Sequence, residues 1–337
     1  MSTTADLLNK LVSQKNTLAD NLVEKGVEAT HNETLETLIP KVLDISSGST
    51  EQKGVYPLDS EGYPTGDVII PEGVVRLNSD SLKFHYNKNV TSIELPSTFR
   101  EFAPSACSYS RSLIDVIIKS DDYVLFNKSA FEECNALTNI HFTNPKTKVK
   151  FLENSYGKYF FSNTNITDSV VEEILARTIT GLGEYTFKNC LNLKELALPI
   201  LGKHMFIGSS GITKIIVNDG ITDMPEGALR DLKALKYIYI PASIVDSESL
   251  TKSNGYTTYF LQHNTNIETI EVGDGWNASA NFSVSDKLTK ECIVNIFNNL
   301  KDLSGEDSKS LVFGEVNLAK LTDEEKAIAT NKNWILS

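Results

Sequence analysis

Residue patterns that carry chemistry are scarce in this chain of 337 residues. The four cysteines form no CxxC pair and the five histidines are scattered, so no zinc-ligand spacing is present. The phosphate-binding, metalloprotease, nucleophile-elbow and EF-hand motifs are missing as well. Adjacent carboxylates such as Asp121 and Asp122 point apart and rarely share a substrate. The sequence therefore predicts no catalytic residues, no metal site and no cofactor.

Long apolar runs and an excess of basic residues are also missing. No stretch approaches the roughly 18 apolar residues that a bilayer-spanning helix needs. The first residues, MSTTADLLNKLVSQKNTLADN, contain no basic region followed by an apolar core, so we expect no signal peptide. The formal net charge of -12 repels phosphate backbones. We expect a protein made in a cytoplasm, with neither nucleic acid as a partner nor insertion into a membrane.

An amphipathic helix is predicted over residues 4–25. Gly26 ends it, and a second short helix, bent or split at Pro40, is predicted over residues 34–43. These helices either pack on the domain that follows or gather several chains. We favour the second, because so short a seam is unstable alone in water. If Lys15 takes one position of a heptad seam, the leucines recur at alternating three- and four-residue steps: Leu8, Leu11, Leu18 and Leu22.

The stretch TTADLLNKLVSQKNTLADNLVEKGVEATHNETLETLIPKVLDI resembles the N-terminal segment of many tail-associated proteins of phages and prophages of Gram-positive bacteria. In those proteins the phrase LADNLxxKGV…A…ETLxTLIPKVLDI recurs. The resemblance implies a segment that oligomerises or attaches to a phage particle. It therefore implies a virion location, with other tail or baseplate proteins as partners. Residues 46–66 are rich in Ser, Gly and Pro and are expected to form a linker.

A short apolar pattern repeats from about residue 67 onward. It consists of an apolar residue, two spacers, a second apolar residue, one spacer and a third. The last two lie on one face of a short strand, and each unit is too small to bury that face without neighbours. A period near 23 residues therefore predicts a solenoid. The copies are Val90/Ile93/Leu95, Leu113/Val116/Ile118, Leu137/Ile140/Phe142, Leu193/Leu196/Leu198, Ile212/Ile215/Val217, Leu235/Ile238/Ile240 and Ile267/Ile270/Val272.

A second phrase recurs between the strands, as AFEEC at residues 130–134 and TFKNC at residues 186–190. Cys134 and Cys190 each precede the next leucine of the repeat by three residues. This shared phase predicts that both thiols face inward and serve a structural role. The pattern AFxxCxxLxxIxxP resembles the BspA-like subclass of leucine-rich repeats, which lacks an asparagine ladder. The resemblance covers residues 67–275 and implies a leucine-rich repeat solenoid.

The period fails in two stretches, residues 143–181 and 244–264. In the first, Asp168 is predicted to cap an inserted helix that has Glu172 in its first turn. Insertions in a solenoid usually project from one face and are often where ligands bind. We interpret the first stretch as a degenerate repeat plus this helix.

Residues 276–337 are predicted to form a small α/β cap. An amphipathic helix is expected over residues 285–304, a strand over 310–314 and a final helix over 317–334. This segment resembles the C-terminal unit that closes many repeat-bearing phage and Gram-positive surface proteins. The resulting fold class is an α+β repeat protein with a coiled-coil-like segment at residues 1–45, a linker, a leucine-rich repeat solenoid and a cap.

Aromatic residues gather in the irregular stretches, beside Asn, Asp and Ser. They include Tyr63 in the linker and the run Phe84-His85-Tyr86. Aromatic faces with polar neighbours suit sugar binding, although such rings also pack insertions onto a core. Tyr237 and Tyr239 alternate with the apolar residues of a strand and so face outward. The candidate ligand-binding residues are Trp276, Tyr237, Tyr239, Tyr256, Tyr259, Tyr156 and Tyr159.

Together these features predict a non-catalytic binding protein. We expect a homo-oligomer, most simply a trimer, attached to a phage tail or baseplate by its N-terminal segment. The expected ligand is a host cell-wall glycopolymer or a host surface protein, bound through avidity. Two alternatives remain at this stage. One is a purely structural tail or baseplate component, and the other is a bacterial leucine-rich repeat adhesin or scaffold.

Overall fold

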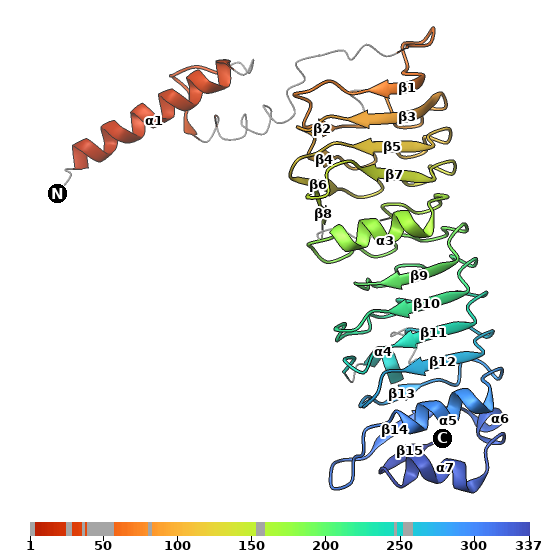
Figure 1. The fold of residues 1–337 in the computed structure, drawn as a ribbon. Helices are drawn as coiled ribbons and strands as arrows, with labels where there is room; N and C mark the ends of the chain where they lie inside the picture. Colours follow the sequence, from red (N-terminus) through yellow and green to blue (C-terminus); the bar gives the residue numbers. More distant parts are fainter. Residues whose placement is uncertain are drawn as a thin grey trace.

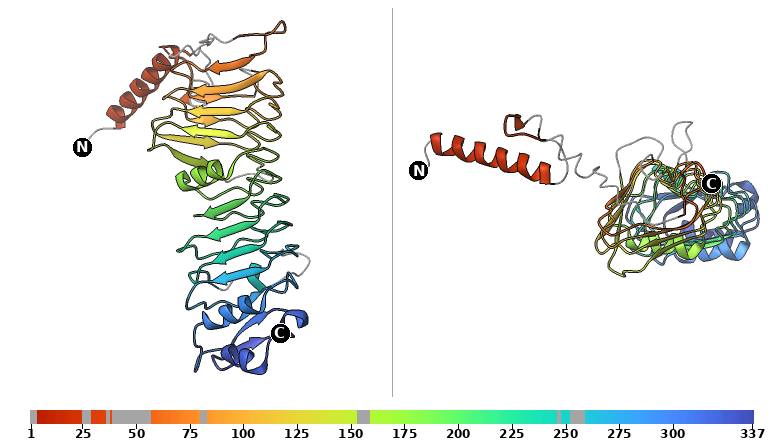
Figure 2. Two further views of the ribbon diagram at one scale, coloured as in Figure 1. Left: turned by 45° about the vertical axis from the view of Figure 1, so that its right-hand side comes forward. Right: turned by 90° about the horizontal axis from the view of Figure 1, so that it is seen from above.

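Parallel strands that stack along one axis dominate the computed structural model (Figure 1). Viewed from above, successive coils lie over one another around a shared core (Figure 2). The structure describes residues 4–24, 29–35, 38, 57–79, 83–152, 159–245, 248–251 and 259–337. The helices are α1 (Thr4–Glu24), α3 (Asp168–Arg177), α4 (Glu248–Thr251), α5 (Lys290–Asn298), α6 (Glu315–Leu318) and α7 (Asp323–Thr330).

Two four-stranded parallel sheets line the first half of the stack, in the orders β1-β3-β5-β7 and β2-β4-β6-β8. The second half has one such sheet, β9-β10-β11-β12, and the cap has β13-β14-β15. The strands are β1 (Gly66–Ile69), β2 (Arg76–Leu77), β3 (Val90–Leu95), β4 (Glu101–Phe102), β5 (Asp115–Ile118), β6 (Tyr123–Phe126), β7 (Asn139–Phe142), β8 (Lys148–Phe151), β9 (Glu195–Leu198), β10 (Lys214–Val217), β11 (Tyr237–Ile240), β12 (Thr269–Val272), β13 (Ala280–Asn281), β14 (Lys309–Val312) and β15 (Trp334–Leu336).

The repeat phase predicted from the sequence is confirmed. All apolar residues of the seven copies are buried, and the last two of each copy alternate with partly or fully exposed residues along a strand. Inside the coils, rings of neighbouring repeats stack with centroids 5.6 Å apart at each step, in the order Phe131, Phe161, Phe187 and Phe206. Stacked aromatic rings add to the free energy gained by burying their area. The recurring phenylalanine thus forms a continuous column behind the strands.

A row of polar side chains links each coil to the one before it. Within this row, a side chain at one fixed position of the coil donates a hydrogen bond to a buried backbone carbonyl of the preceding coil. We name this row the cross-coil ladder. Its hydrogen bonds run from Ser110 Oγ to Phe84 O, Cys134 Sγ to Cys107 O, Cys190 Sγ to Phe161 O, Ser209 Oγ to Phe187 O and Asn264 Nδ2 to Leu229 O. Hydroxyl, thiol and amide groups therefore do the work of an asparagine ladder.

The inward-facing thiols predicted from the sequence are confirmed. Cys134 and Cys190 are fully buried, and burial raises the pKa of each thiol to about 12. Both Sγ atoms donate hydrogen bonds to carbonyl oxygens in the cross-coil ladder. A protonated thiol is the form that such a hydrogen bond requires. The two cysteines therefore pack in the core and provide hydrogen bonds to buried backbone carbonyl groups.

Helix α3 takes the place of a strand between β7 and β9 (Figure 1). Its carboxylates accept hydrogen bonds from the backbone of β9 and the residue before it. Lys194 N lies 2.8 Å from Asp168 Oδ1, and Ala197 N lies 2.7 Å from Glu172 Oε1. The expectation that Asp168 caps the helix is wrong, because Thr167 occupies the N-cap position and the Asp168 carboxylate is engaged by β9. The helix supplies the acceptors that a missing strand would have supplied.

Helix α5 closes the other edge of the same sheet. Cys292 Sγ accepts a hydrogen bond from Ile270 N and donates one to Ile270 O, each at 3.2 Å. Asn299 Nδ2 donates to Val272 O at 2.8 Å. The helix is shorter than the predicted range 285–304, because Thr289 caps it and its last helical residue is Asn298. Both ends of the β9–β12 sheet are therefore covered by helices, which protects its strands from edge-to-edge pairing.

The predicted final helix over residues 317–334 is wrong in its limits. The segment divides into α6 and α7, because a capping box formed by Thr322 and Glu325 begins a new helix. Trp334 does not end this helix but begins β15. The cap therefore adds a strand to its own small parallel sheet.

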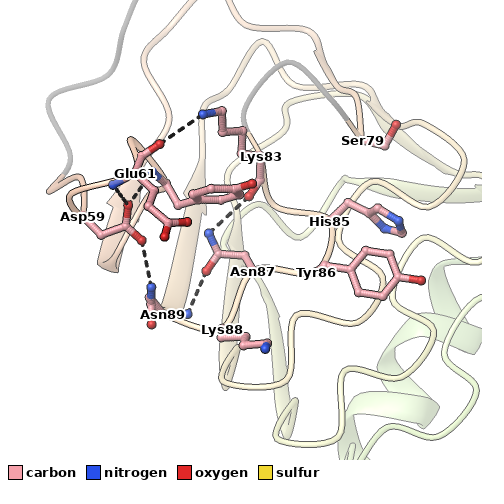
Figure 3. Close-up of a pocket in the computed structure, with 10 residues that line it drawn as sticks. Asp59, Glu61, Ser79, Lys83, His85, Tyr86, Asn87, Lys88 and Asn89 are labelled. Carbon is pink, nitrogen blue, oxygen red and sulfur yellow. Dashed lines mark hydrogen bonds between the residues drawn. The ribbon is translucent and has the colours of Figure 1, made fainter.

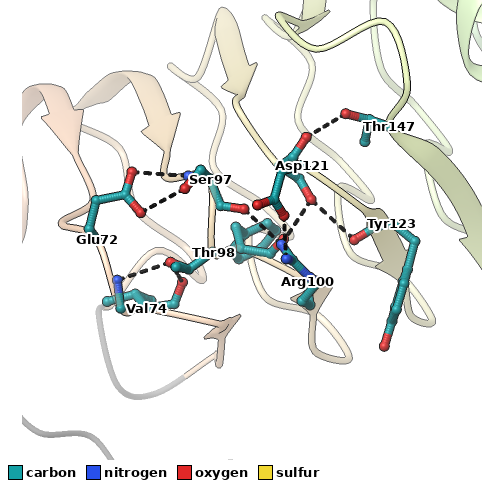
Figure 4. A network of polar contacts seen from close by, with 11 residues as sticks. Glu72, Val74, Ser97, Thr98, Arg100, Asp121, Tyr123 and Thr147 are labelled. Atoms are coloured by element: carbon teal, nitrogen blue, oxygen red, sulfur yellow. Dashed lines mark hydrogen bonds and ion pairs between the residues drawn. The ribbon is translucent and has the colours of Figure 1, made fainter.

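Polar contacts also tie the bends of the first coils together (Figure 4). Glu72 accepts hydrogen bonds from the backbone N and the Oγ of Ser97, both at 3.1 Å. Arg100 donates to Ser97 O at 2.7 Å and to Ser120 Oγ at 3.2 Å, and it pairs with Asp121. One guanidinium thus joins two successive bends.

The predicted N-terminal helix is confirmed as α1, and the association of chains through it stays a prediction. Ala19 and Leu38 form a small buried cluster of their own, against which Leu18 packs. Leu11 is 52% exposed in the single chain, as a seam residue would be before association. The side chains of Leu8 and Leu22, and residues 39–56 with most of the second helix and the linker, lie outside the described residues.

Removing one member of the cross-coil ladder is expected to destabilise the fold. Ser209 Oγ accepts from Cys190 N and donates to Phe187 O, so Ser209→Ala leaves two buried backbone groups without these bonds. We expect the free energy of unfolding to fall by about 1–3 kcal/mol for each group left unpaired. Urea unfolding measures the difference. The matched control is Ser210→Ala, because Ser210 is exposed. Equal stability of the two variants would contradict the role of the ladder.

The thiols are expected to resist modification in the folded protein. All four cysteines are free and buried, and burial raises the pKa of Cys292 to about 11. The folded state holds the thiol proton more strongly than the unfolded state does, because burial raises the folded-state pKa. The stability gained by burying the protonated thiol is therefore present in full below about pH 8.5, and it is lost as the pH rises through the folded-state pKa. At pH 8 a thiol-specific disulfide reagent should label none of the cysteines until denaturant is added. Rapid labelling of the native protein would show that a thiol is accessible.

Candidate functional site

The outer face of the β9–β12 sheet carries the two tyrosines predicted to face outward. Tyr237 and Tyr239 lie on β11 and are half-buried, whereas Ile238 and Ile240 beneath them are fully buried. The Tyr237 hydroxyl donates to Glu271 Oε2 at 2.6 Å, and the Tyr239 hydroxyl donates to Asp219 Oδ1 at 3.0 Å. The predicted orientation is confirmed, and carboxylates on neighbouring coils fix both rings.

Charge on this face is mixed. Lys214 Nζ lies 5.4 Å from the ring centroid of Tyr237 and 3.9 Å from the Glu195 carboxylate. Burial and the hydrogen bond to Glu271 raise the pKa of the Tyr237 hydroxyl to about 12, so the phenol stays protonated at neutral pH. Such a group is poorly matched to general acid–base chemistry near pH 7. The face instead offers ring surface and hydrogen-bonding groups to a polar ligand.

Trp276, proposed from the sequence as a ligand-binding residue, lies in the core instead. Its side chain is fully buried and packs near Phe282, and its indole Nε1 donates to Ala278 O at 2.7 Å. The residue also forms a parallel bridge with Leu300 in the cap. Because the buried indole has its hydrogen-bond partner inside the protein, Trp276 presents no ring face to a ligand.

Tyr159 joins a row of rings that the sequence analysis did not find. Tyr159 stacks on Tyr185 at 5.2 Å, and Tyr185 stacks on His204 at 5.3 Å. Gly227 continues the row; a Cβ atom there would lie 2.2 Å from His204 Nδ1. Burial lowers the pKa of His204. The sequence contains a pattern that could have predicted this row, because each of these rings stands two residues before the phenylalanine of its repeat.

The other predicted tyrosines contribute less to this picture. Tyr259 occupies the same repeat phase beyond Gly227, where it is half-buried against the main core. Burial raises the pKa of its hydroxyl. Tyr156 and Tyr256 lie outside the described residues.

A cleft of about 640 Å³ opens at the start of the repeat stack (Figure 3). The loop of residues 57–65 forms one wall, and the turn of residues 83–89 forms the other. Asn87 Nδ2 donates to Pro64 O at 3.0 Å and thereby joins the two walls. The aromatic rings that line the cleft are those of Tyr63, His85 and Tyr86, from the two aromatic stretches singled out in the sequence. The structure brings these stretches together.

Neither a membrane helix nor a metal centre is found in the part of the chain that the structure describes. None of its helices combines the length and the apolar character needed to cross a bilayer. Likewise, no cluster of three His, Cys, Asp or Glu side chains in these residues could hold a metal ion.

Comparison with solved structures gives distant likenesses. A leucine-rich repeat protein from Bacteroides ovatus ATCC 8483 is 17% identical, with 80% of this chain and 74% of that chain covered and a TM-score of 0.43. The T. pallidum leucine-rich repeat protein is 15% identical, with 84% and 95% covered and a TM-score of 0.30. A leucine-rich cell surface protein from Faecalibacterium prausnitzii A2-165 is 13% identical, with 64% and 92% covered and a TM-score of 0.18. No curated protein sequence matches the chain.

The family is shown by the repeats themselves. The description "BspA type leucine rich repeat region" matches residues 65–176 and 154–277, in six copies. These ranges together cover more than half of the chain, and they contain strands β1 to β12, the phenylalanine column and the cross-coil ladder. The chain therefore belongs to the family of BspA-type leucine-rich repeat proteins.

Proposed function

We propose that this chain is a non-catalytic binding protein that recognises a bacterial cell surface through the outer face of its β9–β12 sheet. The observation that carries the proposal is the pair Tyr237 and Tyr239, held half-exposed by hydrogen bonds to Glu271 and Asp219. Amphipathic rings held in place cost little conformational entropy when a ligand binds. A cell-wall glycopolymer or a surface protein is the ligand class that suits such a face.

Attachment to a phage tail or baseplate forms the second part of the proposal. It is supported by the resemblance of residues 3–45 to segments of tail-associated proteins, and by the amphipathic α1, which exposes Leu11. In this arrangement α1 gathers several chains, most simply three, and the virion carries them to the host. Weak sites held at fixed spacing then bind strongly together, because the second and third contacts form within one molecule.

Replacing both surface tyrosines is expected to abolish most cell-wall binding. We expect Tyr237→Ser with Tyr239→Ser to weaken binding of the full chain at least tenfold, since aromatic hot-spot residues typically contribute about 2 kcal/mol or more. Co-sedimentation with isolated walls from a panel of Gram-positive bacteria measures the effect. The matched control is Tyr123→Ser, because Tyr123 is a half-buried tyrosine of β6 in the β2-β4-β6-β8 sheet, away from the proposed face.

Two outcomes would count against this assignment. Unchanged wall binding by the double variant would move the site away from β11. Failure of the wild-type oligomer to bind any wall, combined with binding to tail proteins, would favour the purely structural alternative. Wall binding by a chain without any association with tail proteins would favour an adhesin outside a phage.

Deleting residues 1–45 is expected to convert the oligomer into a monomer. The physical reason is that a short apolar seam gains its stability from partner chains. Light scattering coupled to size-exclusion chromatography gives the mass of the full and truncated chains. If the truncated chain keeps the stoichiometry of the full chain, the N-terminal segment is not the element that associates.

A further inference from the structure

Tyr86 is the outer ring of a stacked pair of tyrosines, on the wall of the cleft that precedes the first full repeat. Its ring stacks on Tyr109 of the next coil, with centroids 4.7 Å apart. Tyr109 in turn has Arg111 beside it, 5.9 Å from its centroid. Tyr109 therefore supports one face of the Tyr86 ring from the side of the following coils, and the opposite face of Tyr86 points toward the start of the stack.

The neighbouring histidine also contacts the Tyr86 ring. His85 lies 4.2 Å from Tyr86 and 6.3 Å from Tyr109, measured between ring centroids. The planes of His85 and Tyr86 are inclined at 68°, so these two rings meet in a T-shaped contact and do not stack. No other ring or cation in the described part of the chain packs on Tyr86, which is 59% exposed.

Hydrogen bonds hold the two walls of the cleft in place before any ligand arrives. Asp59 accepts from Tyr63 N at 2.8 Å and from Asn89 Nδ2 at 3.0 Å, so one carboxylate joins the loop to the turn. Asn87 adds the second link, to Pro64. Lys83 Nζ covers the ring of Tyr63, at 4.7 Å from its centroid. Of the two tyrosines, Tyr86 is the more exposed, and it is therefore the ring that we consider for stacking with a ligand.

The charges around the cleft are balanced. Asp59 and Glu61 supply carboxylates, and Lys83 and Lys88 supply ammonium groups. A ligand of strong single-sign charge would gain attraction from one pair and repulsion from the other. Side chains that donate and accept hydrogen bonds surround an exposed ring, which matches a ligand that has an apolar face and hydroxyl groups at its rim.

We propose that this cleft is a second binding site, which takes an uncharged saccharide unit stacked on the exposed ring of Tyr86. Asn89, Glu61 and Lys88 line the same cleft and provide hydrogen bonds to its hydroxyl or acetamido groups. The assignment to a saccharide rests on the proposed function for its ligand class, but the site is separate from the β11 tyrosines. The volume of about 640 Å³ accommodates a short saccharide, being within the usual range of about 300–1,000 Å³ for ligand pockets.

Titration of the full chain with two uncharged trisaccharides, maltotriose and triacetylchitotriose, tests the proposal by calorimetry and ligand-observed NMR. Tyr86 adopts a left-handed backbone with φ 58°, which Asn163 and Asn189 also adopt at the corresponding position of later coils. Tyr86→Asn therefore removes the ring without straining the turn. We expect it to weaken binding at least tenfold, whereas Tyr86→Phe, which keeps the ring, should stay within about threefold of wild type.

The outcomes separate this site from the β11 face. Equal trisaccharide binding by wild type and Tyr86→Asn, or no saturable binding of either sugar to wild type, would overturn the cleft proposal. Wall binding that survives in Tyr86→Asn but is lost in the double Tyr237/Tyr239 variant would leave the proposed function intact. Saccharide binding by the wild-type chain without any wall binding would support the cleft site and count against the proposed function. Unchanged urea unfolding of Tyr86→Asn serves as the folding control.

Discussion

Hydrogen bonds from one coil to a buried carbonyl of the coil before it determine the spacing on which this structure depends. Cys190, Ser209 and Asn264 differ in chemistry, yet each donates to the same position of the previous repeat. Because the donor must reach a fixed acceptor, successive coils are held in a constant phase. The stacked phenylalanines and the parallel strand pairs follow from that phase, as does the outward direction of Tyr237 and Tyr239. A backbone carbonyl left unpaired inside the core would cost about as much free energy as several surface contacts provide.

The two helices at the edges of the β9–β12 sheet solve one problem in two ways. α3 supplies carboxylates from Asp168 and Glu172 to strand N–H groups, whereas α5 supplies the Cys292 thiol and the Asn299 amide. A parallel sheet can therefore stop without exposing an unpaired edge. The binding face that we assign to this sheet is limited by the same two helices, so its width is set by the number of strands between them.

Much of this fold could be predicted because the repeat pattern states which residues are buried. Leu235, Ile238 and Ile240 are in the core as the spacing required, and the alternation placed their tyrosine neighbours outside. Features that depend on contacts between coils could not be read from one repeat. The sequence alone suggested that Asp168 caps a helix, but its carboxylate instead accepts a backbone hydrogen bond at the start of β9. It also suggested that Trp276 lies at the surface, but its side chain is fully buried. The cleft lies between a linker loop and a turn some 20 residues away, and no local sequence pattern predicts that these two segments come together.

The replacement of a strand by α3 also makes the length of this molecule adjustable. Because α3 finishes one sheet and begins the next, each half has a closed boundary at that point (Figure 1). A relative that gained or lost one repeat on either side would keep the sheet edges at α3 covered. Each repeat gained or lost between Tyr86 and β11 would change the separation of Tyr86 from the β11 tyrosines by about 4.8 Å, the distance between neighbouring strands. The number of repeats thus sets the separation of the two proposed sites, and evolution can match this separation to the spacing of groups on a polymer by adding or removing repeats.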